Sequence, residues 1–475
     1  MEDLKLLGEK DGAKIYEFKI SRPLAEREKV AVDILDTLKR RGFETYFAGG
    51  AVRDELLGIT SHDIDIVTAA KPEEVEKLFA KSYDRGKQFG VVAVLEGKDE
   101  FEVATFRSDL GIGDHRHPAK VEFTNAKSDA LRRDFTINAL FFDPKANRII
   151  DYVGGIEDLK ERKLNFVGDP KNRIEEDFLR MLRAARFASR FGLTIDDKTS
   201  EAIKLFAKQI VHVSFERTRD ELSKILVNIN RVKGIELLDQ WGLLKELLPE
   251  LELLKGVAQP PEFHSEGDVW AHTMLALKHL PDFCSEELAW TVLLHDIAKP
   301  ETQGFREHPK SKITFFEHDV LSARKAEEIL NRFKFSNEFI DKVSWSIAQH
   351  MRIIHAFGDM SDRKKQKLFI DPNIDLLLEH TRADLLASIR HDGTTDLSMY
   401  ENALKLKVEV AKKVSEEEKK QVRHFNLITG RDIMNVLKLA PGPKVGEIKR
   451  KIEQAYLDGK ISTREQALKM IKELK

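Results

Sequence analysis

The sequence predicts a small mixed α/β domain followed by a long, mainly α-helical region. The first part contains short runs of β-branched and aromatic residues bounded by Gly, Asp or Lys, which is typical of strands. From about Asp158 onward these runs fade, and apolar residues recur at helical spacing, as in Arg173–Phe191. We therefore expect the sheet to end near Tyr152 and helices to continue to the end of the chain.

Five runs are expected to be strands: ETYFAGG (44–50), DIDIVT (63–68), FGVVAVLEG (89–97), FEVATF (101–106) and TINALFF (136–142). A helix is expected over Lys71–Lys81, because Pro72 falls in its first turn, where the missing N–H costs nothing. Later helices are expected over Phe215–Asn228 and Asn230–Trp241. The paired prolines after Gln259 cannot continue a helix, so they mark a boundary.

Composition excludes several classes of protein. The 475 residues are 41% hydrophobic, which is enough for a sizeable core and argues against wholesale disorder. A net charge of −2 excludes a uniformly basic nucleic-acid coat, but a local basic groove remains compatible with it. Cys284 is the single cysteine, which excludes internal disulfides and thiolate metal clusters. With no signal pattern and no long apolar segment, we expect a cytoplasmic protein without membrane contact.

Three carboxylates in the first domain predict a metal site. If His62–Val67 is a strand, Asp63 and Asp65 point to one face, while Ile64 and Ile66 point the other way, into the core. Two adjacent carboxylates repel each other, so such a pair usually holds a divalent metal. Glu102 would complete the cluster if its strand is a neighbour. Such a cluster with two Mg²⁺ ions suits nucleotidyl transfer, although an isolated Asp-x-Asp is equally compatible with a solvated strand end.

A glycine pair precedes these carboxylates. Gly49 and Gly50 would let the backbone approach a phosphate closely, and the helix that follows would offer its N–H groups to the anion. Arg53 would lie one turn along that helix. The segment therefore indicates a nucleotide-binding turn.

Six motifs occur in order between about Phe43 and Leu226: AGGAVRDELLG, DIDIVT, LRRDFTINAL, DYVGGIEDL, EEDFLRMLRAARF and ERTRDELSKIL. In this series the sequence resembles class II tRNA nucleotidyltransferases, the bacterial CCA-adding enzymes, and the related bacterial poly(A) polymerases. The resemblance implies a polymerase-β-like head in which Asp63 and Asp65 are the catalytic metal ligands. It also implies that Arg132 and Arg133 contact the triphosphate and that Asp134 contacts the ribose. Guanidinium groups suit phosphate, although an isolated Arg-Arg-Asp would be a surface charge cluster.

Asp177 and Arg180 are expected at the start of a long helix, three residues apart and on one face. A carboxylate could accept from the exocyclic amine of cytosine or adenine, while a guanidinium donates to the adjacent ring nitrogen. Uracil and guanine would leave both protein groups unpaired, at about 1–3 kcal/mol for each buried group. On spacing alone, a solvated salt bridge is the simpler interpretation. Because the other motifs occur in order and the resemblance implies this role, we favour a base-reading pair.

Further along this helix, Arg183, Arg186 and Arg190 could clamp the triphosphate or the RNA end, with surface solvation as the alternative. The polar segment Arg107–Lys120 is expected to be a long loop. The resemblance implies that a flexible loop here is needed for adding the terminal A.

The later helices predict a second metal site. His295 and Asp296 end an apolar helical run, and imidazole with carboxylate suits Mn, Fe, Ni, Zn or Mg. The pattern resembles the HD phosphohydrolase superfamily, which implies the ligands His272, His295, Asp296 and Asp384. His318 and His350 stand where members with two metals have extra ligands. Other histidines, including His264, are interpreted as structural or surface residues.

We expect an N-terminal extension (1–26), a nucleotidyltransferase head (27–156), a helical neck that reads the base and binds RNA (157–258), an HD domain (259–410) and a helical tail (411–475). The expected function is addition of C, C and A to tRNA 3′ ends from CTP and ATP with Mg²⁺, with an accessory phosphohydrolase site as an open question. An A-adding enzyme and a poly(A) polymerase share the same motifs. An HD phosphohydrolase with an RNA-binding head and a non-catalytic RNA-binding scaffold are alternatives of other classes.

Overall fold

The structure is a computed structural model that describes residues 4–61, 63–113, 118–305, 313–357, 360–424, 427–440, 442–457 and 460–474. The chain forms two compact units. The first unit comprises Met1–Ala348 and Ala383–Thr395, and the second comprises Gln349–Arg382 and Asp396–Lys475. The division into an extension, head, neck, HD domain and tail stays a prediction.

A nine-stranded sheet forms the centre of the head, in the order β1-β2-β11-β10-β3-β4-β7-β6-β5. Its strands are β1 (Lys5–Lys10), β2 (Ala13–Glu17), β3 (Thr45–Ala48), β4 (Asp65–Thr68), β5 (Ser82–Gly86), β6 (Val91–Glu96), β7 (Asp99–Thr105), β10 (Leu140–Asp143) and β11 (Arg148–Asp151). The pairing of β4 with β7 is parallel, and Ile66 lies opposite Val103. The sheet is therefore mixed and ends at Asp151, and each run that the sequence predicts to be extended contributes a strand.

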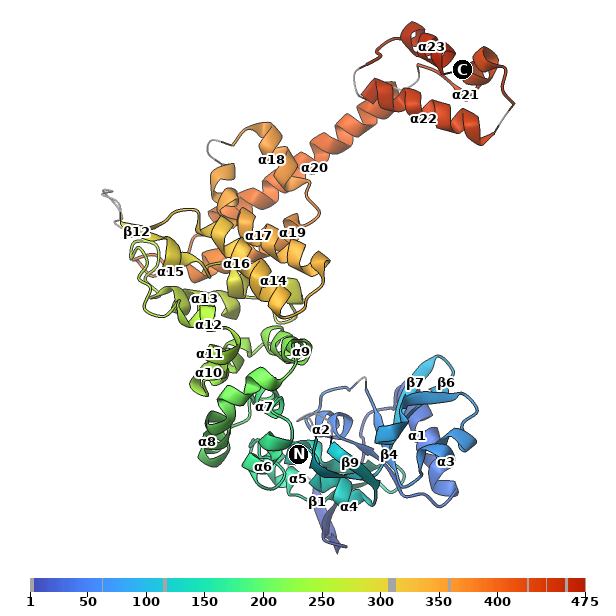
Figure 1. The fold of residues 1–475 in the computed structure, drawn as a ribbon, viewed down its shortest axis with the longest axis vertical. Coiled ribbons are helices and arrows are strands. Elements are labelled where there is room, and N and C mark those ends of the chain that lie inside the picture. Colours follow the sequence, from blue (N-terminus) through green and yellow to red (C-terminus); the bar gives the residue numbers. More distant parts are fainter. Residues whose placement is uncertain are drawn as a thin grey trace. The chain divides into compact units, whose positions relative to one another are not determined.

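The head helices are α1 (Glu26–Arg40), α2 (Gly50–Leu56), α3 (Pro72–Leu78), α4 (Ala126–Leu131) and α5 (Gly155–Lys160), with short 3₁₀ turns η1 (Lys87–Phe89) and η2 (Thr136–Asn138). Helix α3 begins at Pro72, as the first-turn proline predicts. The core beside β3 and β10 contains Ala48, Phe106 and Phe141, which pack against the alanines of α4. Helix α2 packs against β3 and β10 (Figure 1).

The helical region that follows contains α6 (Pro170–Glu176), α7 (Arg180–Phe191), α8 (Asp197–Phe206), η3 (Ala207–His212), α9 (Phe215–Leu226), α10 (Arg231–Gln240), α11 (Leu243–Leu247) and α12 (Pro249–Glu252). The expected single helix over Arg173–Phe191 is wrong, because the chain breaks into α6 and α7 at Asp177. Asp177 is the C-cap of α6, with φ −154° and ψ 106°, and its carboxylate accepts a hydrogen bond from Leu179 N in the turn before α7.

The remaining elements of the first unit are α13 (Val269–Lys278), α14 (Glu286–Leu294), α15 (Lys299–Thr302), α16 (His318–Arg332) and the hairpin β12 (Gln303–Phe305) and β13 (Ile313–Phe315). Helices α17 (Asn337–Ala356) and α19 (Ile374–Ala387) contribute residues to both units. The second unit also contains α18 (Asp362–Phe369), α20 (Ser398–His424), α21 (Gly430–Leu437), α22 (Pro443–Leu457) and α23 (Arg464–Glu473). The last three helices share an isoleucine-rich core around Ile433, Ile452 and Ile471.

The expected long loop over Arg107–Lys120 is also corrected. Strands β8 (Arg107–Ile112) and β9 (Pro118–Phe123) pair as an antiparallel ribbon, with Asp109 opposite Val121. Residues 114–117, which connect the two strands in the sequence, lie outside the described residues. The polar composition of the segment concealed the strands, because a two-stranded ribbon need not bury either face.

Arg231 joins the neck to the region after Pro261. Its guanidinium is 1% exposed and donates to the backbone oxygens of Leu226, Leu277, Leu280 and Pro281. Most of these acceptors lie in and just after α13, whereas Arg231 begins α10. A buried charge satisfied by backbone oxygens from two parts of the chain fixes them together.

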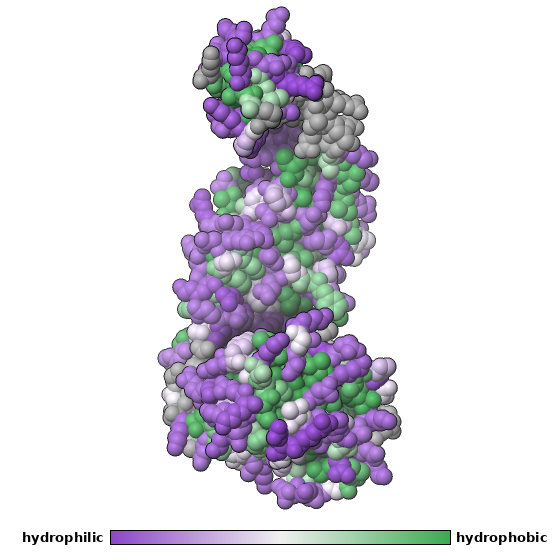
Figure 2. Space-filling view, turned by 90° about the vertical axis from the view of Figure 1, so that its right-hand side faces the viewer, coloured by the Kyte–Doolittle hydropathy of each residue, from purple (hydrophilic) through white to green (hydrophobic). Residues whose placement is uncertain are grey.

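The face of the molecule in Figure 2 carries hydrophilic side chains throughout, with hydrophobic side chains in smaller groups between them. Within the described residues, we find no helix with the length and apolar character needed to span a membrane.

Gly155 occupies a position that admits no side chain. A Cβ there would lie 2.3 Å from the backbone oxygen of Thr136. We expect Gly155→Ala to lower the free energy of unfolding by about 1–3 kcal/mol, because backbone rather than a flexible side chain must move. Thermal unfolding followed by circular dichroism would measure the loss. Gly446→Ala is the matched control, since nothing lies within 4 Å of a Cβ there. Equal melting temperatures for the two variants would contradict this account.

Candidate functional sites

A polar cavity of about 570 Å³ lies between the head and the first neck helices. It brings together residues from α2, β4, the turn around η2 and both sides of the break between α6 and α7. Its lining residues are Gly49, Gly50, Arg53, Asp63, Asp65, Arg132, Arg133, Asp134, Asn138, Asp177, Arg180, Arg183, Arg186 and Phe187. The motifs in which the sequence predicts a nucleotide site therefore meet in one place.

The two aspartates reach this cavity in a way that differs slightly from the prediction. Strand β4 begins at Asp65, so Asp63 precedes the strand, while Ile64 and Ile66 are buried as expected. Burial and the neighbouring Asp63 carboxylate raise the pKa of Asp65 to about 6. A carboxylate held near a second carboxylate in this way favours a divalent cation, whose charge would relieve the repulsion.

Glu102 lies beside Asp65 through the parallel pairing of β4 and β7, and its charge also raises the Asp65 pKa. Its carboxylate forms an ion pair with Arg85 at 3.1 Å and is not among the residues that line the cavity. Its role as a third catalytic carboxylate stays a prediction.

Gly49 supplies a backbone shape that few other residues adopt, with φ 68° and ψ −129°. A Cβ at this position would lie 3.1 Å from Arg133 Nη1 and 3.4 Å from Asp65 Oδ2. The absence of a side chain therefore lets an arginine and an aspartate approach the start of α2 together.

Arg53 lies one turn into α2, as predicted, but its guanidinium is 4% exposed. It donates to Asp54 Oδ1 at 2.6 Å and to the side-chain oxygen of Asn138. Arg53 is thus tied into the wall of the cavity by groups of the head itself.

The Arg132-Arg133-Asp134 segment is held by a carboxylate that the sequence analysis missed. Asp129 is 1% exposed and accepts from Arg132 at 2.6 Å and from Arg133 at 3.0 Å. It precedes the two arginines by three and four residues, and this spacing at the end of α4 could have identified it. Asp129 therefore fixes the two guanidinium groups at the cavity.

Asp134 contacts the neck. Its Oδ2 accepts from Arg183 at 2.6 Å, and its Oδ1 accepts from the amide of Asn138 at 3.0 Å. Burial alone would raise the pKa of Asp134, but Arg183 and Asn138 outweigh it and lower the pKa to about 2. The carboxylate is therefore ionised throughout the physiological range.

Asp177 and Arg180 both line the cavity, but they do not form the helical i,i+3 pair that the spacing predicted. Asp177 lies in the break and bonds to Arg217 of α9 at 2.7 Å, whereas Arg180 opens α7 and bonds to Glu176 at 2.6 Å. The expectation was wrong because one helix was assumed across the Asp177 cap. Each group is held by a separate partner.

Helix α9 supports the wall of the cavity at a second point. Glu221 is 3% exposed and accepts from Arg186 at 2.5 Å, and it lies one turn beyond Arg217. The motif ERTRDELSKIL was visible in the sequence, but its side chains could not be assigned to partners without the fold. Arg190, by contrast, is exposed and 3.4 Å from Asp54.

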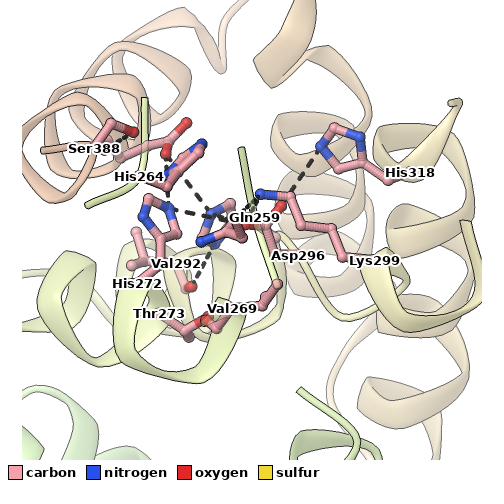
Figure 3. A network of polar contacts seen from close by, with 12 residues as sticks. Gln259, His264, Val269, His272, Thr273, Val292, Asp296, Lys299, His318 and Ser388 are labelled. Carbon is pink, nitrogen blue, oxygen red and sulfur yellow. Dashed lines mark hydrogen bonds and ion pairs between the residues drawn. The ribbon is translucent and has the colours of Figure 1, made fainter. Parts of the chain in front are cut away.

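A second polar cluster lies between α13, the end of α14, the start of α16 and the segment around Asp384 (Figure 3). Ligand atoms of His272, His295 and Asp384 lie within 4.8 Å of one another. His272 Nε2 is 3.0 Å from Asp384 Oδ1, and His295 Nε2 is 3.0 Å from Asp296 Oδ2. His318 Nε2 lies 3.5 Å from Asp296 Oδ1. Five of the six residues predicted for this site therefore gather, and they could hold a divalent metal.

His350 belongs to the second unit, so its predicted place among the extra ligands stays a prediction. Two residues of the first unit that the sequence analysis did not select join the cluster. Lys299, which is 6% exposed, lies 2.7 Å from Asp296 Oδ2 and donates to Gln259 Oε1. Glu266 contacts His272, and although burial opposes it, hydrogen bonds from His264 and His272 lower the Glu266 pKa to about 2.

The mixed sheet, the aspartates at the start of its inner strand β4 and the arginine-lined cavity define a nucleotidyltransferase, to which a helical region with a His/Asp cluster is joined. Family models agree with this class. The poly A polymerase head domain matches residues 45–165, and the RNA and SrmB-binding site of polymerase A matches 192–254. The HD domain matches 268–389, and the model called tRNA nucleotidyltransferase domain 2 matches 402–471.

The chain belongs to the family of CCA-adding enzymes. It is 31% identical over 444 residues to the CCA-adding enzyme of Enterococcus faecalis, a match that covers 93% of this chain and 94% of that enzyme. It is 32% identical to the CCA-adding enzyme of Ligilactobacillus salivarius over 91% of this chain and 93% of that one. These relatives confirm the family that the six motifs indicate.

The fold agrees with a solved structure. The crystal structure of the Bacillus stearothermophilus CCA-adding enzyme in complex with CTP has a TM-score of 0.60 to this chain, at 24% identity. The match covers 95% of this chain and 98% of that chain. The predicted fold class, an α/β head followed by mainly helical regions, is confirmed.

Proposed function

We propose that this protein adds C, C and A to the 3′ ends of tRNA from CTP and ATP and releases pyrophosphate. The observation that carries the proposal is the meeting of Asp63 and Asp65 with the two-arginine motif and the Asp177 break in one cavity, within a chain 31% identical to a CCA-adding enzyme over nearly its whole length. The substrates are inferred from the names of the relatives, and the carboxylates and arginines of the cavity are suited to bind them.

Asp63 and Asp65 are suited to hold Mg²⁺, because they offer hard oxygen ligands. Burial and the Asp63 carboxylate both raise the pKa of Asp65, and a bound cation would favour its ionised form. When bound, the metal would activate the attacking hydroxyl and stabilise the pyrophosphate. Arg132 and Arg133, oriented by Asp129, would bind the triphosphate. The Asp134 carboxylate could accept from a ribose hydroxyl while it remains paired with Arg183.

Base selection would fall to Asp177 and Arg180. Arg217 and Glu176 hold them in place, so the pair is organised before a nucleotide enters. Asp177 would accept from the exocyclic amine of C or A, and Arg180 would donate to the ring nitrogen beside it.

The test supplies three RNAs: a tRNA that ends before the first C, a tRNA that ends after the second C, and a generic RNA 3′ end. Each is incubated with CTP, ATP or both. The proposal expects C, C and A on the first RNA, A alone on the second and little addition to the third. If the second RNA receives A but the first RNA is not extended, the protein is an A-adding enzyme. Long A tails on the generic RNA would indicate a poly(A) polymerase.

We also propose that the second cluster is a metal-dependent phosphohydrolase site, carried by the convergence of His272, His295 and Asp384. Imidazoles mixed with carboxylates favour a transition metal over Mg²⁺. His295→Ala with Asp296→Ala should remove hydrolysis of phosphate esters or cyclic phosphates and leave CCA addition with Mg²⁺ nearly unchanged. Assays of both activities on one preparation measure this. Loss of both activities at an unchanged melting temperature would show that the two sites are coupled.

A further inference from the structure

One carboxylate oxygen of Glu266 accepts hydrogen bonds from two imidazoles. Its Oε1 lies 2.8 Å from Nδ1 of His264 and 2.8 Å from Nδ1 of His272. The two rings meet edge to face, with centroids 5.0 Å apart. The Glu266 side chain is 2% exposed, so these contacts are made away from solvent.

This contact decides which nitrogen of His272 can bind a cation. An ionised carboxylate only accepts hydrogen bonds, so Nδ1 of His272 must carry the proton that it donates to Glu266. In the neutral imidazole, Nε2 is then the nitrogen with the free lone pair. Nε2 is also the atom that faces Asp384, at 3.0 Å. Glu266 thus presents the lone pair of His272 to the metal-capable cluster.

Glu266 is also tied to the segment that carries Asp384. Its Oε2 accepts from Ile389 N at 2.9 Å. The neighbouring Ser265 donates from its backbone N to Ile389 O at 2.8 Å and from its hydroxyl to Arg390 O at 3.0 Å. These bonds connect the turn before α13 to the chain just after Asp384. The same side chain therefore constrains two of the proposed metal ligands, which are 112 positions apart in the sequence.

We propose that Glu266 is a positioning residue of the HD metal site: it fixes the tautomer and direction of His272 and holds the Asp384 segment beside it. The proposal rests on the phosphohydrolase site proposed above. Carboxylates that accept the second N–H of a metal-binding histidine typically contribute 10–100-fold to metal affinity.

The test measures binding of Co²⁺ to the full-length chain by calorimetry and by the visible absorption of the bound ion. Asp63→Ala and Asp65→Ala are included throughout, so that the head binds no metal. Glu266→Gln should weaken Co²⁺ binding by roughly 10–100-fold and alter the spectrum. The amide has similar volume, but it cannot accept from His272, His264 and Ile389 at once. The melting temperature without metal should change little.

Two variants provide matched controls. Glu262→Gln makes the same chemical change at an exposed glutamate nearby and should leave Co²⁺ binding unchanged. His264→Asn removes one partner of Glu266 but keeps its bond to His272, so binding should fall by no more than about threefold. If Glu266→Gln does not fold, Glu266→Asp, which keeps the charge on a shorter side chain, should weaken Co²⁺ binding in the same direction.

The outcomes separate this inference from the phosphohydrolase proposal. Absence of Co²⁺ binding with Glu266 intact would overturn both. Equal affinity of Glu266→Gln and the chain with Glu266 intact would overturn the positioning role alone. If Glu266→Gln binds one Co²⁺ fewer per chain and the remaining Co²⁺ ions bind with unchanged affinity, Glu266 is itself a metal ligand. This outcome also overturns the positioning role.

Discussion

Asp65→Ala is expected to lower CCA addition by on the order of 10³-fold or more while leaving the fold intact, because it removes a ligand of the proposed catalytic metal. Asp65 lies at the start of β4, and its carboxylate is repelled by Asp63. Removing the carboxylate relieves this repulsion, so the folded state should lose little stability. Incorporation of labelled CTP into a tRNA that lacks its 3′ end measures the effect.

The pH dependence provides a second test at the same residue. Metal binding requires the ionised carboxylate, and the pKa of Asp65 is raised to about 6. At limiting Mg²⁺, addition should therefore fall as the pH decreases through about 6, and excess Mg²⁺ should restore it. Glu96→Ala, at an exposed glutamate of β6, is the matched control. Robust addition by a well-folded Asp65→Ala protein would refute the proposed metal site.

Asp177→Ala combined with Arg180→Ala is expected to relax nucleotide selection, with UTP and GTP gaining roughly 10–100-fold relative to CTP and ATP. The physical reason is that the variant lacks the acceptor and the donor that match C and A, so the wrong base no longer meets groups it cannot pair with, a penalty of about 1–3 kcal/mol for each group. The ratio of kcat/KM for CTP to that for UTP measures the change.

Lys171→Ala, at an exposed position in the first turn of α6, should leave the ratio unchanged. Because Arg217 holds Asp177 at 2.7 Å, Arg217→Ala should weaken the selection in the same direction. An unchanged preference in the double variant would place base reading on other residues.

The fold class could be predicted from local patterns in the sequence, and the gathering of the site residues from the resemblance that six ordered motifs carry. Alternation in FEVATF placed Phe101 and Val103 in the core, and both are buried. The doublet His295-Asp296 at the end of an apolar helix likewise anticipated its place at the end of α14.

Side-chain pairing could not be predicted, because it depends on segments that are distant in the sequence. Arg183 and Asp134 are 49 residues apart, and Arg217 and Asp177 are 40 apart. The break at Asp177 was missed for a different reason: an acidic residue is compatible both with a helix interior and with a cap, and here the cap prevailed. Strand β8 (RSDLGI) carries no alternation that distinguishes it from a loop, and the alternation in β9 (PAKVEF) lies mostly beyond Lys120, where the expected loop ended.

Arg231 limits how freely the chain can be divided. Gln259 to Pro261 looks like a natural place to shorten the protein, yet the guanidinium of Arg231 takes three of its backbone acceptors, Leu277, Leu280 and Pro281, from beyond that point. A protein truncated there would keep the positive charge in an apolar interior and lose most of what solvates it. The neck and the helices after Pro261 are therefore expected to fold as one piece, although separate family models match them.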